Sequence, residues 1–276
     1  MLILAATPIG NLDDASTRLR ETLANASHIA AEDTRTLRRL AAGLGIKLTA
    51  QLHSFHEHSD AAKVDLLVRI SSEADLILLT DAGMPTLSDP GFELVRACIQ
   101  SDVEVSVLPG PNAALAAIAI SGLPTDRFCV EGFVAKTSAA RKRQFLVLQE
   151  EPRTMIFYDS PNRILATLRD AIEVFGSDRQ ASISRELTKR FEQTVRGSLA
   201  ELAIWATNDV RGELVLVIAG IGNRKATMQL TDVQLVEELT ALRTEGVSLR
   251  DAAGELSKST GIARNRIYEL GIKSKL

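Results

Sequence analysis

Short apolar runs alternate with helical stretches over the first 122 residues of the chain. The apolar runs are candidate strands, at residues 2–7, 28–31, 51–55, 76–80 and 103–108. The stretches between them have helical spacing, at residues 16–25, 34–42, 61–71, 91–100 and 113–121. The run at 76–79 is apolar throughout, as expected of a strand covered on both faces. The alternation predicts an α/β domain at residues 1–122 with a largely parallel sheet.

A second alternating region follows the segment Gly-Leu-Pro-Thr at 122–125, which is typical of a linker. Its candidate strands are residues 127–134, 154–158, 181–185, 194–196 and 213–219. Its candidate helices are residues 138–149, 162–174 and 199–207. The length of the alternation favours a second α/β domain at residues 123–222 over one large sheet.

The last region, residues 223–276, has a helical pattern throughout. Thr231 begins a capping box and Gly246 ends the helix that follows. Two further short helices, separated by a turn at Gly261, complete the pattern of a helix-turn-helix-like bundle. From residue 250 onward six basic residues outnumber three acidic ones. This excess is compatible with a nucleic-acid surface and equally with a bundle that only docks.

Composition narrows the function classes. The 276 residues carry a formal net charge of −3, so any contact with nucleic acid must be a local patch. Cys98 and Cys129 are the only cysteines, which leaves no disulfide scaffold or recognisable zinc set and fits a reducing cytosol. The N-terminus lacks a positively charged leader, and no apolar run approaches the roughly 18 residues of a membrane span. We expect a soluble, cytoplasmic protein with no membrane partner.

The segment 80–91, Thr-Asp-Ala-Gly-Met-Pro-Thr-Leu-Ser-Asp-Pro-Gly, joins an apolar strand to a helix. Ligands bind at the carboxyl ends of strands in open α/β sheets. The loop has glycines for close backbone approach, prolines for rigidity, and two aspartates, but no Lys or Arg. Because a phosphate-binding loop normally pairs Gly with Lys, this loop favours a cationic or zwitterionic ligand such as S-adenosylmethionine. The alternative is a tight turn with aspartates as helix caps.

Two similar loops follow other predicted strands. Pro-Gly-Pro-Asn-Ala at 109–113 contains a natural N-cap, Asn112, and opens a helix of small residues that can press against a sheet or a ligand. Thr-Pro-Ile-Gly-Asn-Leu at 7–12 ends the first strand. Three such loops together predict the rim of a binding site.

These loops belong to a set of six motifs in a fixed order: 7–12, Ala-Glu-Asp-Thr-Arg at 31–35, Ser-Phe-His-Glu-His at 54–58, 80–91, 109–113, and Tyr-Asp-Ser-Pro-Asn-Arg at 158–163. The set resembles the tetrapyrrole-methylase (class III) methyltransferases. Within them it is similar to the branch that methylates the ribose 2′-oxygen of a cytidine in bacterial 16S ribosomal RNA. The resemblance covers residues 1 to about 222 strongly and the helical tail more loosely.

The resemblance implies two α/β domains with S-adenosylmethionine in the cleft between them, and a homodimer. It also implies 16S ribosomal RNA, within the 30S subunit, as the partner, and the cytidine at position 1402 of that RNA as the target. The positions that carry over for the cofactor are Pro8, Asp81, Gly83, Met84, Leu87, Asn112, Ala113, Tyr158 and Leu214.

The catalytic candidates are Asp33 and Arg35, which follow the second predicted strand. Methylation of a sugar oxygen requires the hydroxyl to be aligned behind the methyl carbon and its proton to leave. We expect Asp33 and Arg35 to orient the target ribose, with Asp33 as the proton acceptor. The alternative is that the carboxylates only complement a helix N-terminus.

The candidate RNA contacts are basic or stacking side chains. The segment 136–143 contains four basic and no acidic residues, and Phe55 with His56 forms a candidate platform for bases. Basic residues at 184–190 are expected to face the cleft between the two domains. The alternative is that Glu186 pairs with one of them as a structural bridge. Three histidines at 53, 56 and 58 would allow zinc, but methyl transfer from a sulfonium needs no metal, so no metal is expected. The resulting RNA-binding set is His56, Lys136, Arg141, Lys142, Arg143 and Arg163.

Three functions fit these features. The first is ribose methylation of ribosomal RNA, the second is methylation of a tetrapyrrole or another small molecule, and the third is a non-catalytic RNA-binding assembly factor. The basic segment and the helical tail favour RNA over a porphyrin-like substrate, and the cofactor loops argue against a purely structural role.

Overall fold

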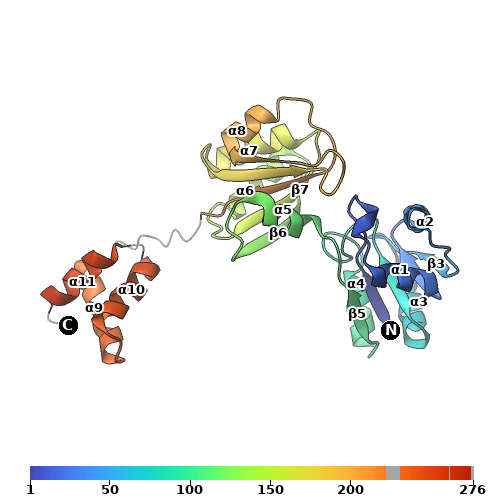
Figure 1. Cartoon of the computed structure of the whole chain (residues 1–276), viewed down its shortest axis with the longest axis horizontal. Helices are drawn as coiled ribbons and strands as arrows, with labels where there is room; N and C mark the ends of the chain where they lie inside the picture. The colour runs from blue at the N-terminus through green and yellow to red at the C-terminus, as the bar shows by residue number, and fades with distance from the viewer. Residues whose placement is uncertain (222–230, 261, 275–276) are drawn as a thin grey trace. The chain divides into compact units, whose positions relative to one another are not determined.

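The computed structural model describes residues 1–221, 231–260 and 262–274 (Figure 1). The described chain forms two compact units. The first contains Met1–Gln149 and Thr154–Ala219, and the second contains Glu150–Arg153 and the described residues from Gly220 onward. No helix within these ranges has the length and apolar character needed to cross a membrane.

The first unit begins with a five-stranded sheet in the order β3-β2-β4-β1-β5. All four strand pairs are parallel, which confirms the prediction. The carboxyl ends of the strands therefore meet at one edge of the sheet, and the loops that leave β1, β2, β4 and β5 emerge there. The strands are β1 (Leu2–Ala5), β2 (His28–Ala31), β3 (Gln51–Ser54), β4 (Leu76–Leu79) and β5 (Val105–Leu108).

Helices cover both faces of this sheet, and its central strand β4 is accordingly apolar and buried throughout. Alternate residues of β4 show the two faces, since Ile77 and Leu79 lie in one buried cluster and Leu76 and Leu78 in another. The first cluster includes residues of α1 (Thr17–Asn25) and α2 (Thr34–Gly43), and the second includes residues of α3 (Ala61–Glu73) and α4 (Phe92–Gln100). A short 3-10 helix at Leu12–Asp14 was not predicted.

The second sheet of the same unit has the order β6-β7-β10-β8-β9 and is mixed. β6 and β7 are parallel, and the other three pairs are antiparallel. The register of β6 shifts between Val130 and Gly132, where Gly132 has a φ of 74°, so that the edge strand carries a bulge. The strands are β6 (Phe128–Phe133), β7 (Thr154–Asp159), β8 (Gln180–Arg185), β9 (Gln193–Ser198) and β10 (Leu214–Ile218).

One face of the second sheet is covered by α6 (Ser138–Val147), α7 (Ile164–Phe175) and α8 (Leu199–Trp205). The other face is covered by α5 (Ala113–Ser121), whose Ala114 and Ala117 pack with Val215 and Val217 of β10. The pattern had assigned α5 to the first domain. The helix lies on the second sheet because its small side chains allow close approach to the β surface. In the chain it connects the last strand of the first sheet to the first strand of the second sheet.

The described residues of the second unit form three helices, as predicted (Figure 1). They are α9 (Asp232–Thr244), α10 (Leu249–Thr260) and α11 (Arg264–Lys273), and their common core includes Leu235, Leu239, Ala253 and Ile267. The capping box at Thr231 is confirmed. The predicted turn residue Gly261 lies outside the described residues.

The close packing of α5 predicts that Ala117 does not tolerate a larger side chain. Ala117 has no exposed surface, so Ala117→Leu should overfill the interface and lower the free energy of unfolding by about 1–3 kcal/mol. Ala119→Leu, on the exposed side of α5, is the matched control and should change it by less than about 0.5 kcal/mol. Urea unfolding followed by the fluorescence of Trp205, which packs against the second sheet, measures both variants. Equal stability of the two variants would contradict this packing.

Candidate functional site

A cavity of about 340 Å³ lies at the carboxyl edge of the first sheet. The loops after β1, β2, β4 and β5 line one side of it, and β6, β7 and β10 line the other. Five of the lining residues carry carboxylates, and none of the described residues around the cavity is Lys, Arg or His. The carboxylates are Glu32, Asp81, Asp89, Asp159 and Glu213.

The loop between β4 and α4 has an unusual backbone. Gly83 and Gly91 have φ values of 82° and 135°, and the non-glycine residues Thr86 and Ser88 have φ values of 75° and 66°. Positive φ is costly for residues with a side chain and is concentrated at functional sites. The loop is tied to the end of β1 by two hydrogen bonds between the backbones of Thr7 and Gly83, of 2.8 and 3.2 Å. The strained loop is thereby held at the cavity.

The opposite walls of the cavity are formed by α5 and the second sheet. The Asn112 side chain caps α5 by accepting a hydrogen bond of 3.0 Å from the backbone N–H of Leu115. Phe133 and Tyr158, on neighbouring strands, have ring centroids 5.3 Å apart. Phe133 is 63% exposed although it is a large aromatic residue, so it offers a stacking surface at the cavity.

Two of the five carboxylates are neutralised by cations outside the cavity lining. Asp159 forms an ion pair of 3.0 Å with Arg163 and accepts a hydrogen bond of 2.6 Å from Thr167. Glu213 lies 2.9 Å from Lys189. Glu32, Asp81 and Asp89 have no ion-pair partner within the described chain, although the backbone N–H of Asp81 donates to Glu32 at 3.3 Å.

Of the three carboxylates without an ion-pair partner in the described chain, Asp89 has a perturbed pKa. Burial, followed by the negative charges of Glu32 and Asp81, raises the pKa of Asp89 to about 6, and the neighbouring Thr80 hydroxyl opposes this. The pKa of Tyr158 is raised by burial and by the charge of Asp89. Asp89 is therefore close to residues of both sheets and is partly protonated near neutral pH.

The structure brings most of the predicted cofactor residues together. Eight of the nine line the cavity: Asp81, Gly83, Met84, Leu87, Asn112, Ala113, Tyr158 and Leu214. Pro8 lies between Thr7, which is bonded to the β4–α4 loop, and the lining residue Ile9. The prediction missed Glu32, Asp89 and Phe133. Glu32 and Asp89 lie inside the six motifs and could have been selected as carboxylates, whereas Phe133 lies after a bulge in β6 that the sequence pattern did not indicate.

Asp33 and Arg35 do not lie in the cavity lining. Asp33 caps α2 and accepts hydrogen bonds of 2.7 Å from the backbone N–H and 2.8 Å from the guanidinium of Arg35. These bonds lower the pKa of Asp33 to about 2, so its carboxylate is a poor proton acceptor. The structure thus supports the helix-cap alternative for Asp33, while the orienting role expected of Arg35, whose side chain is exposed, stays a prediction.

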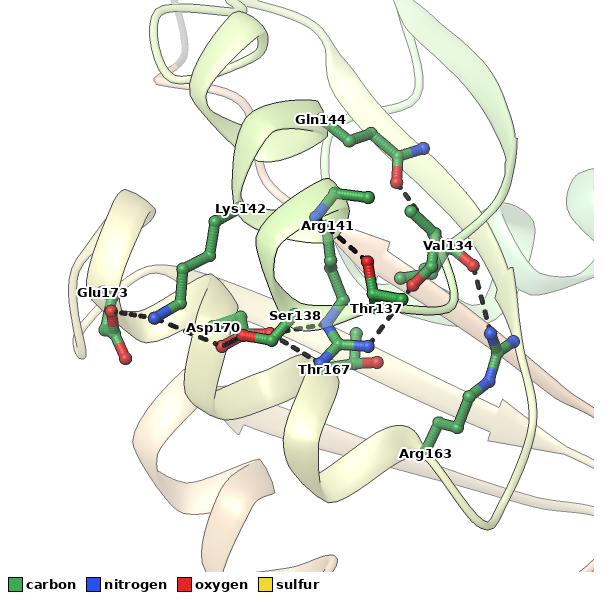
Figure 2. A network of polar contacts seen from close by, with 12 residues as sticks. Val134, Thr137, Ser138, Arg141, Lys142, Gln144, Arg163, Thr167, Asp170 and Glu173 are labelled. Atoms are coloured by element: carbon green, nitrogen blue, oxygen red, sulfur yellow. Dashed lines mark hydrogen bonds and ion pairs between the residues drawn. The ribbon is translucent and has the colours of Figure 1, made fainter.

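The basic segment 136–143 divides into buried and exposed cations. The Arg141 side chain is 4% exposed, and its guanidinium forms hydrogen bonds and an ion pair with Asp170 of α7 at 2.6–2.7 Å (Figure 2). Ser138 donates to the same carboxylate at 2.9 Å. The prediction of an RNA contact is therefore wrong for Arg141, because its guanidinium is enclosed between α6 and α7.

Lys142 and Arg163 are also engaged within the fold (Figure 2). Lys142 lies 2.6 Å from Glu173, and Arg163 bonds to Ser160 and the Val134 carbonyl besides Asp159. Lys136 and Arg143 are exposed and have no ion-pair partner among the described residues. Of the predicted phosphate contacts in this region, Lys136 and Arg143 are the two that remain free.

The predicted histidines and Phe55 also divide into buried and exposed side chains. His53 is 7% exposed and lies 3.3 Å from His28 between their ring nitrogens, and Phe55 is 4% exposed in the core, so Phe55 is not a platform for bases. His56 is exposed and stays a prediction. The structure, over the residues it describes, contains no group of three or more metal-ligating side chains.

In the segment 184–190, Glu186 pairs with Lys189 at 3.0 Å, which confirms the structural-bridge alternative.

Residues 1–203 match the family model of the tetrapyrrole (corrin/porphyrin) methylases. Over 99% of its length the chain is 43% identical to a Mycobacterium tuberculosis (strain CDC 1551 / Oshkosh) protein named ribosomal RNA small subunit methyltransferase I, of which 95% is covered. Proteins of the same name are 38% identical in Synechocystis sp. (strain ATCC 27184 / PCC 6803 / Kazusa), with 98% covered, and 36% identical in Escherichia coli O157:H7, with 95% covered; each alignment spans 99% of this chain.

Solved structures with the same fold include a diphthine synthase, with a TM-score of 0.60 and 12% identity over 79% of this chain and 89% of that chain. A uroporphyrin-III C-methyltransferase of Thermus thermophilus, complexed with S-adenosylhomocysteine, has a TM-score of 0.51 and 18% identity over 79% of this chain and 96% of that chain. At these identities the likeness shows the fold alone.

The buried ion pair predicts a large effect of Arg141→Ala. The change removes the buried guanidinium from Asp170, leaves only Lys142 at 3.6 Å as its cation, and should lower the free energy of unfolding by about 3–5 kcal/mol. Arg143→Ala, two residues away and exposed, is the control and should change it by less than about 0.5 kcal/mol. Urea unfolding followed by Trp205 fluorescence compares them. If both variants are as stable as the wild type, Arg141 is not the structural residue described above.

Proposed function

Because the chain belongs to the tetrapyrrole methylase family, we propose that it transfers a methyl group from S-adenosylmethionine to small-subunit ribosomal RNA. The family assignment supports the methyl transfer. The full-length similarity to proteins named ribosomal RNA small subunit methyltransferase I supports the substrate class.

The observation that carries this proposal is the charge of the cavity. The cavity is lined by three carboxylates that have no ion-pair partner in the described chain: Glu32, Asp81 and Asp89. None of the described lining residues is a cation. Anionic ligands such as nucleotide phosphates are repelled by such a site, whereas the sulfonium and ammonium groups of S-adenosylmethionine are attracted. The volume of about 340 Å³ lies in the range of small-molecule sites. The residues present therefore fit this cofactor.

The lining divides into groups with separate tasks. Asp81 and Glu32 would hold cationic groups or ribose hydroxyls, and the N-terminal end of α5, at Asn112 and Ala113, would hold a carboxylate. Apolar contacts would come from Met84, Leu87 and Leu214, with Pro8 supporting the rim and Tyr158 closing the opposite wall. When bound, S-adenosylmethionine supplies a methyl group on a positively charged sulfur, which a nucleophilic oxygen can displace.

The finer substrate assignment is the ribose 2′-oxygen of the cytidine at position 1402 of 16S RNA. The support for this position is the set of six motifs that resembles the ribose-methylating branch of the family. The exposed aromatic face of Phe133 at the cavity provides a surface on which a base can stack while its ribose enters.

RNA outside the cavity would contact exposed cations. Lys136, Arg143, Arg35 and His56 are exposed and are available to phosphates or bases. We further propose a cytoplasmic homodimer, acting on the RNA within the 30S subunit. Apolar side chains exposed on two edge strands, Val107 of β5 at 43% and Val130 of β6 at 44%, support an interface between copies.

The proposed reaction predicts transfer of radiolabelled methyl groups from S-adenosylmethionine to RNA. The substrate offered is 30S subunits from cells that lack the protein, with deproteinised 16S RNA and uroporphyrinogen III as alternatives. Label is expected in the RNA of the subunits and absent from the porphyrinogen. Label only in the porphyrinogen would overturn the proposal in favour of a small-molecule methyltransferase.

Cofactor binding depends on Asp81 in this proposal. Asp81→Asn removes a charge from the cavity and should weaken the binding of S-adenosylmethionine by about 10- to 100-fold, the range of a charge-assisted hydrogen bond. Asp102→Asn, in an exposed turn between α4 and β5, is the matched control and should bind like the wild type. Calorimetry measures both, and unchanged affinity of Asp81→Asn would remove Asp81 from the cofactor site.

The two free cations of the basic segment predict a salt effect. Lys136→Ala combined with Arg143→Ala should weaken RNA binding and reduce the slope of log K against log salt by roughly one per lost phosphate contact. Lys142→Ala, at a side chain held by Glu173, should leave the slope near its wild-type value. Filter binding over a range of salt concentrations makes the comparison. An unchanged slope in the double variant would show that the segment is only a solvated helix face.

A further inference from the structure

Methylation of a ribose hydroxyl needs a group that accepts the hydroxyl proton. We propose that Asp89 is this group, an inference that rests on the proposed function. Asp89 lies in the cavity lining, half-buried, on the strained loop between β4 and α4. The sequence motif Ser-Asp-Pro-Gly contains it, but neither the cofactor set nor the RNA-binding set had included it.

Asp89 lines the cavity from within a tight backbone turn. Ser88, immediately before it, has a φ of 66°, and Gly91, two residues after it, has a φ of 135°. The backbone N–H of Thr86 donates to the carbonyl of Pro90 at 3.3 Å, which closes the turn around Asp89. Backbone strain of this kind persists where the surroundings impose it. Here the strained turn carries a half-buried carboxylate that lines the cavity.

The charged and titratable groups that face Asp89 come from both sheets. Glu32 follows β2, Asp81 follows β4, and both act on it through their negative charges. Tyr158 of β7 belongs to the second sheet, and the charge of Asp89 contributes to raising its pKa. The remaining charged groups of the cavity, Asp159 and Glu213, are paired with Arg163 and Lys189. No described cation thus compensates Asp89, and its carboxylate has a high affinity for a proton.

The other carboxylates are less suited to the task. Asp33 is bound by Arg35 outside the cavity lining and has a pKa of about 2. Asp159 and Glu213 are held by their cations. Glu32 accepts the backbone N–H of Asp81, and Asp81 belongs to the proposed cofactor contacts. The burial and neighbours that raise the pKa of Asp89 to about 6 bring it close to the neutral range in which a general base is most effective.

The step balances without a further reactant. The 2′-oxygen forms a bond to the methyl carbon while the bond between that carbon and sulfur breaks, and the electron pair of the broken bond stays on the sulfur, which becomes a neutral thioether. The O–H bond of the hydroxyl breaks, its electron pair stays on the oxygen, and its proton passes to the Asp89 carboxylate. Release of that proton to solvent restores Asp89 for the next turnover.

The test compares Asp89→Asn, Asp89→Glu and the surface control Asp102→Asn. Single-turnover methylation of 30S subunits is measured from pH 5 to 8, and the affinity for S-adenosylhomocysteine, which carries no sulfonium charge, is measured by calorimetry. A ¹³C carboxyl titration of the free protein reports the pKa of Asp89 directly. Thermal unfolding shows whether each variant is folded.

In the wild type the rate should fall as the pH drops through a value at or below about 6, because protonated Asp89 cannot accept a proton. Asp89→Asn should lose about 10²-fold or more of the rate, lose this acid limb, and bind S-adenosylhomocysteine within about threefold of the wild type. Asp89→Glu should recover the limb and part of the rate. Asp102→Asn should be unaffected.

Three results would overturn the assignment. A rate within about threefold of the wild type in Asp89→Asn removes Asp89 from the chemical step. A loss of rate that saturating cofactor restores makes Asp89 a cofactor contact. An acid limb that persists in Asp89→Asn assigns the proton to another group. A wild type that binds S-adenosylmethionine but methylates no RNA would instead contradict the proposed function, independently of Asp89.

Discussion

Mutual repulsion of carboxylates in a half-enclosed space is the constraint on which the site depends. Glu32, Asp81 and Asp89 face one cavity without a cation among its described lining residues, so the cavity favours a proton or a cationic ligand among them. The pKa of Asp89 is raised first by burial and then by the negative charges of Glu32 and Asp81. In the proposed function, a sulfonium cofactor would offset these charges and leave a carboxylate able to take a proton. The same charge arrangement thus selects the ligand and prepares the chemistry.

The fold creates this arrangement by simple means. Parallel pairing brings the loops after β1, β2, β4 and β5 to one edge of the first sheet. The small residues of α5 let that helix lie flat on the second sheet, which supplies the other wall through Phe133, Tyr158 and Leu214. Cations that would neutralise the cavity are held elsewhere, since Arg163 binds Asp159 and Lys189 binds Glu213. The rigid sheets position the strained loop, and that loop positions Asp89.

The sequence predicted the strands and helices well, because their apolar periodicity is strong and independent of distant contacts. Eight of the nine positions predicted for the cofactor line one cavity, since the motifs follow strand ends. The prediction from sequence failed where long-range pairing decides. A run of four basic residues does not reveal that Asp170, on another helix, buries Arg141. The helix α5 has no distinct polar face to indicate which sheet it covers, and the bulge in β6 before Phe133 is a property of strand pairing. Asp33 and Asp89 differ in proton affinity only through their neighbours.

The central claim is that this chain methylates one ribose of small-subunit ribosomal RNA. The most direct measurement maps 2′-O-methylation at nucleotide resolution in 16S RNA from cells that contain the protein, lack it, or carry the Asp89→Asn variant. One methylated cytidine, at position 1402, is expected with the wild-type protein and should be lost in the other two strains. An identical methylation map in cells with and without the protein would rule out the proposed function.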